Sequence, residues 1–431
     1  MQKRVILALM LALTLILSGC ALIEKDAAVD AETEIIRLGD QVVKKGELKP
    51  ELDNMLNLYK MIYGIDPSDE SVVSEIRSEM VEQHKAEMAA KAKAAELGLD
   101  QLTEEEEAKL KEDAEKDYQS QVDSKAASYT DEGLTDEDRQ ARAKEELTAA
   151  GTTVESLLST AREKLINDKI RAYTIQDVKI TDEDIQEKYN ELVEENKTSY
   201  EASASDYCSA MNNGDTLYFA PEGVRLVKQI LIQYDTEKQT AISDANAKVT
   251  AAQAILDSSE DEHTQEEKDQ AQKDLEAAQA EVAALTEEAY ASIDAEADEV
   301  LEKLAAGEDW AALSAEHNDD PGMMEGRKTA ETGYAVCEGM TSFDPAFTEA
   351  AMALKEIGET SGKIRGTSNG YYIIRYVGDV VPGEIGLDAV KDSISADLQS
   401  EAEEAAYQEK IQEWLDAVKD QFKVDLTALK D

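Results

Sequence analysis

The sequence is poor in positively charged and aromatic residues. Its 431 residues include 44 lysines and arginines against 95 aspartates and glutamates, which gives a formal net charge of -51. Such a chain is repelled by nucleic acids and anionic lipid surfaces, so we expect neither as a partner. Because only 5% of the residues are aromatic, the apolar cores must consist largely of alanine, leucine, isoleucine and valine.

Residues that commonly bind metals or carry out covalent catalysis are also scarce. The chain has only three histidines, which are scattered at His84, His263 and His317. They lack the spacing of metal ligands, and no calcium loop, phosphate-binding glycine loop or hydrolytic triad is recognisable. We therefore expect no metal and no cofactor.

Cysteine occurs three times, once near the start of the chain as Cys20 and twice further along as Cys208 and Cys337. In an exported protein, Cys208 and Cys337 could form a disulfide, although two cysteines prove nothing about geometry. Two unpaired, partly buried thiols are the expectation, and the disulfide is the alternative.

The first twenty residues have the organisation of an export signal. Lys3 and Arg4 precede an apolar run over residues 5–17, whose 13 residues are too few to span a membrane. The run ends in Leu-Ser-Gly-Cys at Cys20, which resembles the lipobox of bacterial lipoproteins. This implies a signal peptide over 1–19, a lipid on Cys20, a tether over 20–32 and a place on the extracytoplasmic face of the cell membrane. The alternative is an uncleaved anchor with an idle cysteine.

The most informative motifs lie between residues 222 and 380. Apolar residues at helical spacing and glycines that end helices predict several short elements there. In chain order these are a strand over 224–232, a helix over 298–304, a helix from 309, a turn at 318–322, a helix over 347–354 and a strand over 370–376.

In this order and spacing, the motifs resemble the parvulin family of peptidyl-prolyl cis-trans isomerases over roughly 80 residues. The resemblance implies that Met340, Phe347 and Met352 form the apolar pocket for the proline ring. Asp320 falls on the family's acid or thiol, and Thr367 on the polar residue before the last strand.

This chain departs from the family at Gln229 and Tyr372, which stand where relatives usually have paired histidines. Strand alternation places both side chains among apolar neighbours such as Val227 and Ile374, so their polar ends need partners. We expect them to hydrogen-bond to each other or to Asp320 and to support the site.

The chemistry of isomerisation explains these residue types. Rotation about an Xaa-Pro bond breaks amide resonance across a barrier of about 18 to 20 kcal/mol and needs no cofactor. A dry pocket formed by Met340 and Phe347 would exclude the water that stabilises the planar amide, and Asp320 could act on the carbonyl or the prolyl nitrogen. The alternative is that these apolar residues are ordinary core and Asp320 only shapes a turn.

Amphipathic helices are expected on both sides of this segment. One apolar stripe runs from Val72 to Met88, and another lies within residues 388–422. An unpartnered stripe would be exposed, so residues 385–431 are expected to pack back on the helical region 33–215. This layout resembles exported foldases of the PrsA and SurA type, whose helical module is a chaperone cradle. The resemblance implies unfolded or partly folded exported polypeptides, and their Xaa-Pro segments, as partners.

An insertion over residues 235–296 interrupts the parvulin-like pattern. Small apolar residues on its two arms, such as Ala252 and Ala278, could meet and form an antiparallel helical hairpin, a short coiled coil. This hairpin is either a solvated spacer or an arm that binds clients or a partner.

Together these features predict an α+β protein. A parvulin-like domain over 222–380, with a small antiparallel sheet and the inserted hairpin, joins a mainly helical chaperone domain built from the N- and C-terminal segments. The predicted function is a membrane-anchored foldase with peptidyl-prolyl isomerase activity. A non-catalytic holdase or structural adaptor is the alternative, and whether the chain forms a homodimer stays open. No alternating strand-helix series supports a two-lobed solute-binding protein.

Overall fold

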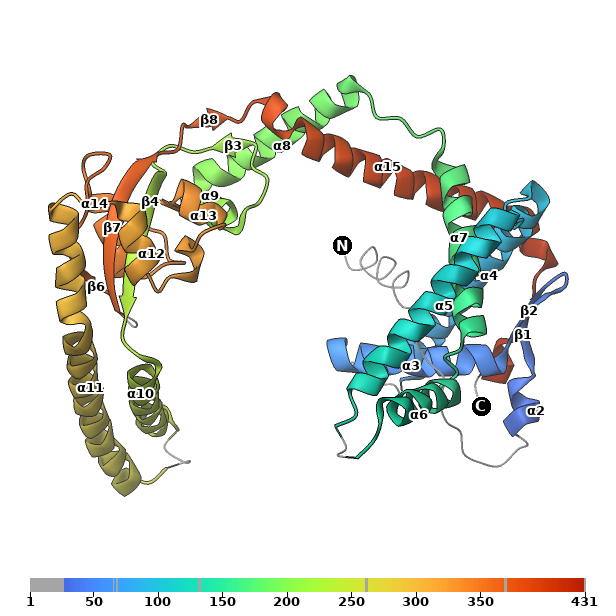
Figure 1. The fold of residues 1–431 in the computed structure, drawn as a ribbon, viewed down its shortest axis with the longest axis horizontal. Helices are drawn as coiled ribbons and strands as arrows, with labels where there is room; N and C mark the ends of the chain where they lie inside the picture. The colour runs from blue at the N-terminus through green and yellow to red at the C-terminus, as the bar shows by residue number, and fades with distance from the viewer. Residues whose placement is uncertain are drawn as a thin grey trace. The chain divides into compact units, whose positions relative to one another are not determined.

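The computed structural model describes residues 27–64, 66, 69–130, 133–259, 263–367 and 370–429 (Figure 1). These residues divide into two compact units. Unit 1 contains the chain up to Lys179 and from Gln399 onward, and unit 2 contains Ile180–Leu398. The fold is α+β, with small antiparallel sheets among many helices, as the sequence predicts.

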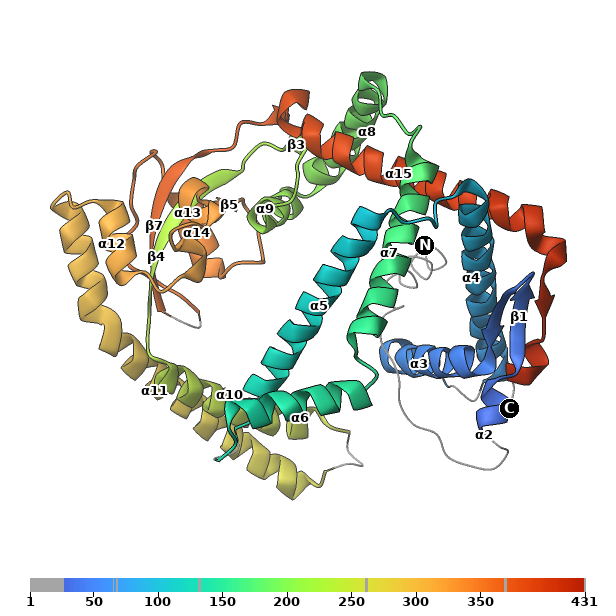
Figure 2. The same ribbon diagram turned by 45° about the vertical axis from the view of Figure 1, so that its right-hand side comes forward.

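Unit 1 is mainly helical, and its helix α5 contacts both α6 and α7 (Figure 2). Its elements are α2 (Ala27–Ala31), β1 (Glu34–Leu38), β2 (Gln41–Lys44), α3 (Lys45–Tyr63), α4 (Glu70–Leu97), α5 (Glu104–Ala127), α6 (Asp136–Ala149), α7 (Val154–Ile175), the second part of α15 (Leu387–Val418), β9 (Lys423–Val424) and the 3-10 turns Lys419–Gln421 and Leu426–Leu429.

Threonines fix where several helices begin. Thr103, Thr135 and Thr153 each accept a hydrogen bond from the backbone N–H three residues further on. Thr181 does the same for α8 (Asp182–Ala202). These capping boxes satisfy N–H groups that have no partner within the helix.

A three-stranded antiparallel sheet, in the order β2-β1-β9, brings the two ends of unit 1 together. Ile36 of β1 lies opposite Val424 of β9. On the core side, Ile36, Leu48 and Met80 are fully buried together with Leu429 from the last turn. The C-terminal segment therefore completes the core of unit 1.

Helix α15 contributes to both units. In unit 2, Ile394 is buried against Ile185 of α8. In unit 1, Ile411 and Trp414 are buried against Ile170 of α7. The sequence assigns the whole of 385–431 to the helical region, whereas in the structure the part of α15 before Gln399 belongs to unit 2.

The expected tether over 20–32 is also shorter in the structure, because Ala27–Ala31 forms helix α2. Lys45 at the start of α3 makes an ion pair of 2.7 Å with Asp30. Cys20 and the signal peptide over 1–19 lie outside the described residues.

Unit 2 holds the strands that the sequence assigns to a parvulin-like domain. Its elements are α8, α9 (Ala204–Asn213), β3 (Phe219–Ala220), β4 (Arg225–Gln233), α10 (Thr236–Asp257), α11 (Gln265–Ala305), α12 (Trp310–His317), the 3-10 turn η1 (Pro321–Met323), α13 (Lys328–Thr332), β5 (Tyr334–Val336), α14 (Pro345–Ala353), β6 (Ile364–Arg365), β7 (Gly370–Asp379), β8 (Gly383–Glu384) and the first part of α15.

The main sheet of unit 2 is antiparallel, with strand order β5-β4-β7-β6. Strands β4 and β7 pair along their whole length, with Leu231 opposite Tyr372. Because side chains alternate along a strand, the sheet has two apolar faces. Helices α11 and α12 cover the face that carries Ile230 and Ile373. Helices α9 and α14 cover the other face, and the candidate site lies there.

The insertion forms the predicted antiparallel hairpin of α10 and α11, which lie side by side in both views (Figures 1 and 2). Ala245, Ala252, Leu275 and Ala278 are buried between the two arms. Helix α11 runs without interruption to Ala305, so it includes the helix that the sequence places separately at 298–304. No glycine or proline occurs between Gln265 and Ala305 to end it.

In the part of the chain that the structure describes, no helix has both the length and the apolar character needed to cross a membrane.

Candidate functional site

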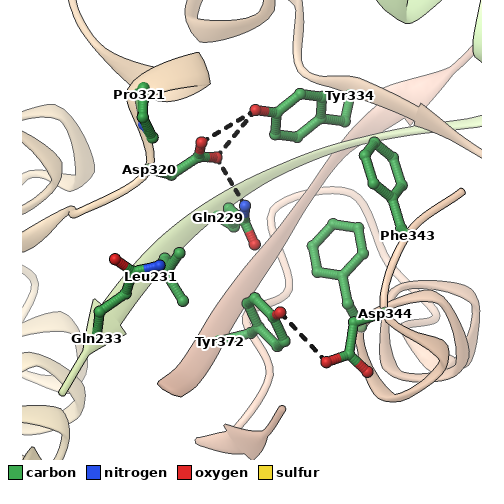
Figure 3. A pocket seen from close by; sticks show the side chains of 10 residues that line it. Gln229, Leu231, Gln233, Asp320, Pro321, Tyr334, Phe343, Asp344 and Tyr372 are labelled. Carbon is green, nitrogen blue, oxygen red and sulfur yellow. Dashed lines mark hydrogen bonds between the residues drawn. The ribbon is translucent and has the colours of Figure 1, made fainter. Parts of the chain in front are cut away.

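A pocket of about 280 Å³ opens on the α14 side of the main sheet in unit 2 (Figure 3). It combines a carboxylate on each side with an aromatic wall between them. Its lining residues are Gln229, Leu231, Gln233, Asp320, Pro321, Tyr334, Phe343, Asp344, Phe347 and Tyr372.

Asp320 lies at one side of the pocket and is buried, with 8% of its surface exposed. Its carboxylate accepts hydrogen bonds from Gln229 Nε2 at 2.7 Å, from the Tyr334 hydroxyl at 3.0 and 3.2 Å and from the backbone N–H of Gly322 at 2.9 Å. Three donors from three elements thus hold the carboxylate in place. A buried carboxylate without such donors would destabilise the folded protein.

Asn318 attaches the loop that carries Asp320 to strand β4. Its side-chain amide donates to the carbonyl of Gln229 at 2.7 Å and accepts from the N–H of Leu231 at 2.9 Å. The same oxygen accepts from the N–H of Asp320 at 3.0 Å. Because one side chain bonds to the strand and to the loop, the position of Asp320 relative to Gln229 is fixed.

Four aromatic rings form the wall of the pocket. Tyr334, Phe343, Phe347 and Tyr372 meet in sequence at centroid distances of 5.2, 5.4 and 5.4 Å, each pair edge to face. This is a favourable geometry for aromatic pairs. The rings come from β5, the loop before α14, α14 itself and β7, so the wall forms only when these elements pack together.

A second carboxylate, Asp344, lies on the other side. One oxygen caps α14 by accepting the N–H of Ala346 at 2.9 Å. The other accepts from the N–H of Thr367 at 2.6 Å, from its hydroxyl at 3.0 Å and from the Tyr372 hydroxyl at 3.3 Å. Asp344 therefore ties the start of α14 to the loop before β7.

Tyr334 is half-buried, and its surroundings favour the neutral phenol. Burial, and then the negative charge of Asp320, raise the pKa of Tyr334 well above its usual range. The ring leaves no space beside Gly322, where an added Cβ would lie 1.8 Å from the Tyr334 hydroxyl oxygen. A glycine at 322 is thus required for the tyrosine to reach Asp320.

The structure brings together four of the residues that the sequence assigns to the site, namely Gln229, Asp320, Phe347 and Tyr372. Of the two partners left open for Gln229, it bonds to Asp320. Tyr372 donates to Asp344 instead, a partner that the sequence does not suggest.

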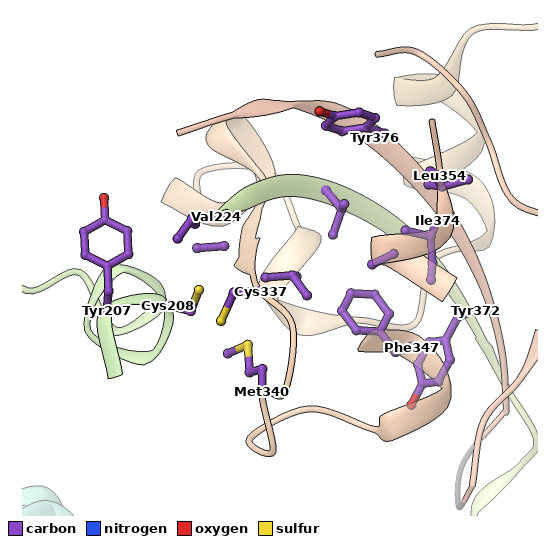
Figure 4. Packing of buried hydrophobic residues seen from close by; sticks show 14 of the residues in the cluster. Tyr207, Cys208, Val224, Cys337, Met340, Phe347, Leu354, Tyr372, Ile374 and Tyr376 are labelled. Carbon is purple, nitrogen blue, oxygen red and sulfur yellow. The ribbon is translucent and has the colours of Figure 1, made fainter. Parts of the chain in front are cut away.

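The other three predicted residues do not line the pocket. Met340 is buried at 4% exposure in the core behind it, with Met352 packed on the same cluster (Figure 4). Thr367 is exposed and reaches the site only through its hydrogen bonds to Asp344. Their assignment to the site stays a prediction.

Sequence reasoning missed Tyr334, Phe343 and Asp344. Asp344 carries a recognisable local signal, because an aspartate directly before Pro345 is typical of a helix N-cap. No such local signal marks Phe343, whose position depends on tertiary packing.

The two remaining cysteines lie in the same core. Cys208 and Cys337 are both buried and both free (Figure 4). The structure thus agrees with the expected unpaired thiols and not with the alternative, a disulfide. Contact with Cys337, and then burial, raise the pKa of Cys208, so this thiol stays protonated. Among the described residues, no group of three or more histidine, cysteine, aspartate or glutamate side chains is arranged to hold a metal ion.

Comparisons with known proteins give sequence relatives that are named foldase protein PrsA. No family model matches the chain. It is 23% identical over 405 residues to the foldase protein PrsA of Clostridium botulinum strain Hall, which covers 93% of this chain and 91% of the relative. It is 24% identical over 196 residues to the foldase protein PrsA of Clostridium tetani, covering 44% and 53%.

A solved structure of foldase protein PrsA from Streptococcus pneumoniae is 14% identical and covers 92% of this chain and 97% of that one, with a TM-score of 0.26. At this score the two chains superpose poorly as wholes. The sequence similarity to the Clostridium botulinum protein, which covers 93% of this chain, spans both units. Over nearly its whole length, this chain is therefore a sequence relative of the PrsA-type foldases.

Proposed function

We propose that the protein is a foldase for exported polypeptides and that the pocket of unit 2 binds Xaa-Pro segments and accelerates their cis-trans isomerisation. One observation carries the proposal: a buried, rigidly held carboxylate, Asp320, lies beside an aromatic wall that includes Phe347 and Tyr372. The similarity to proteins named foldase PrsA supports the same conclusion.

The arrangement suits the chemistry of the Xaa-Pro bond. In the planar amide, resonance places negative charge on the carbonyl oxygen and positive charge on the nitrogen, and twisting removes both. A fixed negative charge near the carbonyl oxygen destabilises the planar form more than the twisted form, which lowers the barrier. We assign this role to Asp320. The donors Gln229 and Tyr334 hold it in place, so little reorganisation accompanies the rotation.

The aromatic wall would hold the proline ring and keep water out. Phe347 is 3% exposed and contacts the rings of Phe343 and Tyr372. Replacement of water by apolar surface removes the hydrogen bonds that stabilise the planar amide. The wall would thus bind the ring and favour the twisted bond.

A non-catalytic holdase is the second candidate. Gln229 and Tyr372 occupy the positions of the histidine pair of the parvulin family, so no imidazole can act there. In unit 1, three consecutive apolar residues at the end of α3, Met61, Ile62 and Tyr63, are 77%, 50% and 54% exposed. An exposed apolar patch of this kind suits contact with unfolded chains.

A proline-limited refolding assay separates the two candidates. Substitution Phe347→Ala would remove a buried ring from the wall, and truncations of this kind weaken packing by about 3 to 5 kcal/mol. We expect slower isomerisation and weaker binding of Xaa-Pro peptides. Phe422→Ala, which removes a partly buried ring from unit 1, is the control. A wild-type protein that suppresses client aggregation without accelerating isomerisation would support the holdase.

We also propose attachment to the extracytoplasmic face of the cell membrane through a lipid on Cys20. The motif Leu-Ser-Gly-Cys after a short apolar run supports it. Cys20→Ala should move the protein from the membrane fraction to the soluble fraction, whereas Cys208→Ala should leave the distribution unchanged. Equal membrane association of Cys20→Ala and wild type would refute the anchor.

A further inference from the structure

One hydrogen-bond acceptor in the pocket has no partner among the residues that the structure describes. Gln229 is 8% exposed, and its side-chain oxygen Oε1 is buried without a hydrogen bond to any of them. Its Nε2 donates to Asp320 at 2.7 Å, which fixes the orientation of the amide, because a flipped amide would place Oε1 against the carboxylate. Oε1 therefore points away from Asp320 (Figure 3). A buried acceptor of this kind needs a donor, and a ligand can supply it.

The charged side chains that line the pocket are all negative. Asp320 and Asp344 are its only charged lining residues, and they lie on opposite sides of Gln229 and Tyr372 (Figure 3). A third carboxylate, Asp319, accepts the backbone N–H of Gln233 at 2.8 Å, next to the pocket. No lysine, arginine or histidine is among the ten residues that line it.

Three cations on strands β4 and β7 of the sheet are directed elsewhere. Lys228 lies between Val227 and Gln229 on β4 and faces Arg375 of β7 in the register. Alternation along the strands puts both side chains on the face opposite to the pocket. The guanidinium of Arg225 donates to the carbonyls that end α14, including that of Ala351 at 2.8 Å. None of these cations neutralises the pocket.

We propose that the pocket selects Xaa-Pro segments in which the residue before the proline is lysine or arginine. The ammonium or guanidinium group would donate to Gln229 Oε1 and lie in the field of Asp320 and Asp344. The ring faces of Tyr334 and Phe343 add a cation–π surface. This contact would hold the residue on the carbonyl side of the isomerising bond, while the aromatic wall holds the proline ring. The inference rests on the function proposed above and adds its substrate class.

The test is a peptide series that differs only in the residue before proline: lysine, arginine, norleucine or glutamate. Norleucine has the apolar stem of lysine without the charge. We expect kcat/KM for the lysine and arginine peptides to exceed that for norleucine about tenfold at low salt, the size of one charge-assisted contact. Glutamate should be the poorest substrate. The preference for lysine and arginine over norleucine should shrink at 0.5 M salt, because salt screens the attraction between the cation and the two carboxylates.

Variants assign the preference to the pocket. Gln229→Met keeps the side-chain volume but removes the acceptor, and Asp344→Asn removes one charge. Both should move the lysine-to-norleucine ratio toward one. Glu349→Gln removes a charge from an exposed position on α14, outside the pocket, and should leave the ratio as in wild type. Where the wild type accelerates isomerisation, equal kcat/KM for the lysine and norleucine peptides would overturn the proposal, even if a variant fails to fold. A lysine-to-norleucine ratio in Gln229→Met that equals the wild-type ratio would also overturn it, because Oε1 would then not contact the cation.

Binding distinguishes this inference from the isomerase activity itself. If no peptide is isomerised faster, the affinities of fluorescently labelled versions of the four peptides are compared. Affinities in the order lysine, norleucine, glutamate would support the selectivity although the enzyme proposal fails. Equal affinities would overturn the selectivity.

Discussion

The side-chain nitrogen of Gln229 lies 2.7 Å from a carboxylate oxygen of Asp320, and both residues are 8% exposed. This bond joins the middle of strand β4 to the loop that begins η1, 91 residues further on. It makes the amide of Gln229 part of the site, because its nitrogen donates to Asp320 while its buried oxygen points away from the carboxylate (Figure 3).

Asp320→Asn should therefore fold. The new amide can accept the N–H of Gly322 through its oxygen and donate to Gln229, whose own amide then turns over. The substitution removes the charge that we propose acts near the Xaa-Pro carbonyl, so we expect turnover to fall roughly tenfold or more, with a smaller change in peptide affinity. Asp319→Asn, which keeps an acceptor for Gln233, is the control. Unchanged kcat in Asp320→Asn would remove Asp320 from the mechanism.

Gly322→Ala tests the contact between Tyr334 and Asp320. The added methyl would lie 1.8 Å from the tyrosine oxygen, so the ring must move and its hydrogen bond to the carboxylate is lost. Overpacking of this kind destabilises by about 1 to 3 kcal/mol. Gly362→Ala is the matched control, because an added Cβ there meets no atom within 4 Å. Urea unfolding of both variants measures the difference, and equal midpoints would contradict the close packing.

The pH dependence of stability should carry a signature of Tyr334. Because burial and Asp320 raise its pKa, the folded protein keeps the phenol protonated above pH 10, where the unfolded chain releases the proton. The stability that the hydroxyl contributes is thus fully present below about pH 10 and falls as the pH rises toward the raised pKa. At pH 8, Tyr334→Phe should be less stable than wild type by about 1 to 2 kcal/mol.

The deficit of Tyr334→Phe should shrink above pH 10, measured by urea unfolding across the pH range. Other buried tyrosines also resist ionisation; burial raises the pKa of Tyr207 to about 12. These contributions are the same in both proteins and cancel in the difference. A deficit that stays constant from pH 8 to 11 would mean that the phenol of Tyr334 ionises as readily in the fold as in the unfolded chain.

Part of the site follows from the sequence because local rules govern it. Alternation along β4 places Gln229 on the face of Leu231, and both line the pocket. The partner of Tyr372 could not be predicted in this way. Asp344 is 28 residues away, and it reaches the tyrosine only because α14 packs on β7.

The contrast between local sequence rules and tertiary packing also explains which features of the helices could be predicted. Apolar spacing shows which face of a helix is buried but not what covers it. The sequence predicts that α15 packs on the helical region alone, whereas in the structure it packs in both units. The sequence also predicts a break in α11 near residue 296, where the family pattern begins. Helical propensity continues across this point without a glycine or proline, and the helix continues with it.

Two substitutions in α15 test its division between the units. Trp414→Ala removes a side chain that is 7% exposed in unit 1 and should destabilise that unit by about 3 to 5 kcal/mol. Ile394→Ala removes a side chain that is 1% exposed in unit 2 and should destabilise that unit by about 2 to 5 kcal/mol.

Hydrogen exchange shows which helices and strands each substitution destabilises. Trp414→Ala should speed exchange in α4 and α7 while β4 and β7 stay protected, because the indole belongs to an apolar cluster of unit 1 that includes Ala94 of α4 and Ile170 of α7. Ile394→Ala should speed exchange in α8 and leave α4 unchanged. If both substitutions loosened the same elements, α15 would belong to a single cooperative unit, and the boundary at Leu398 would be wrong.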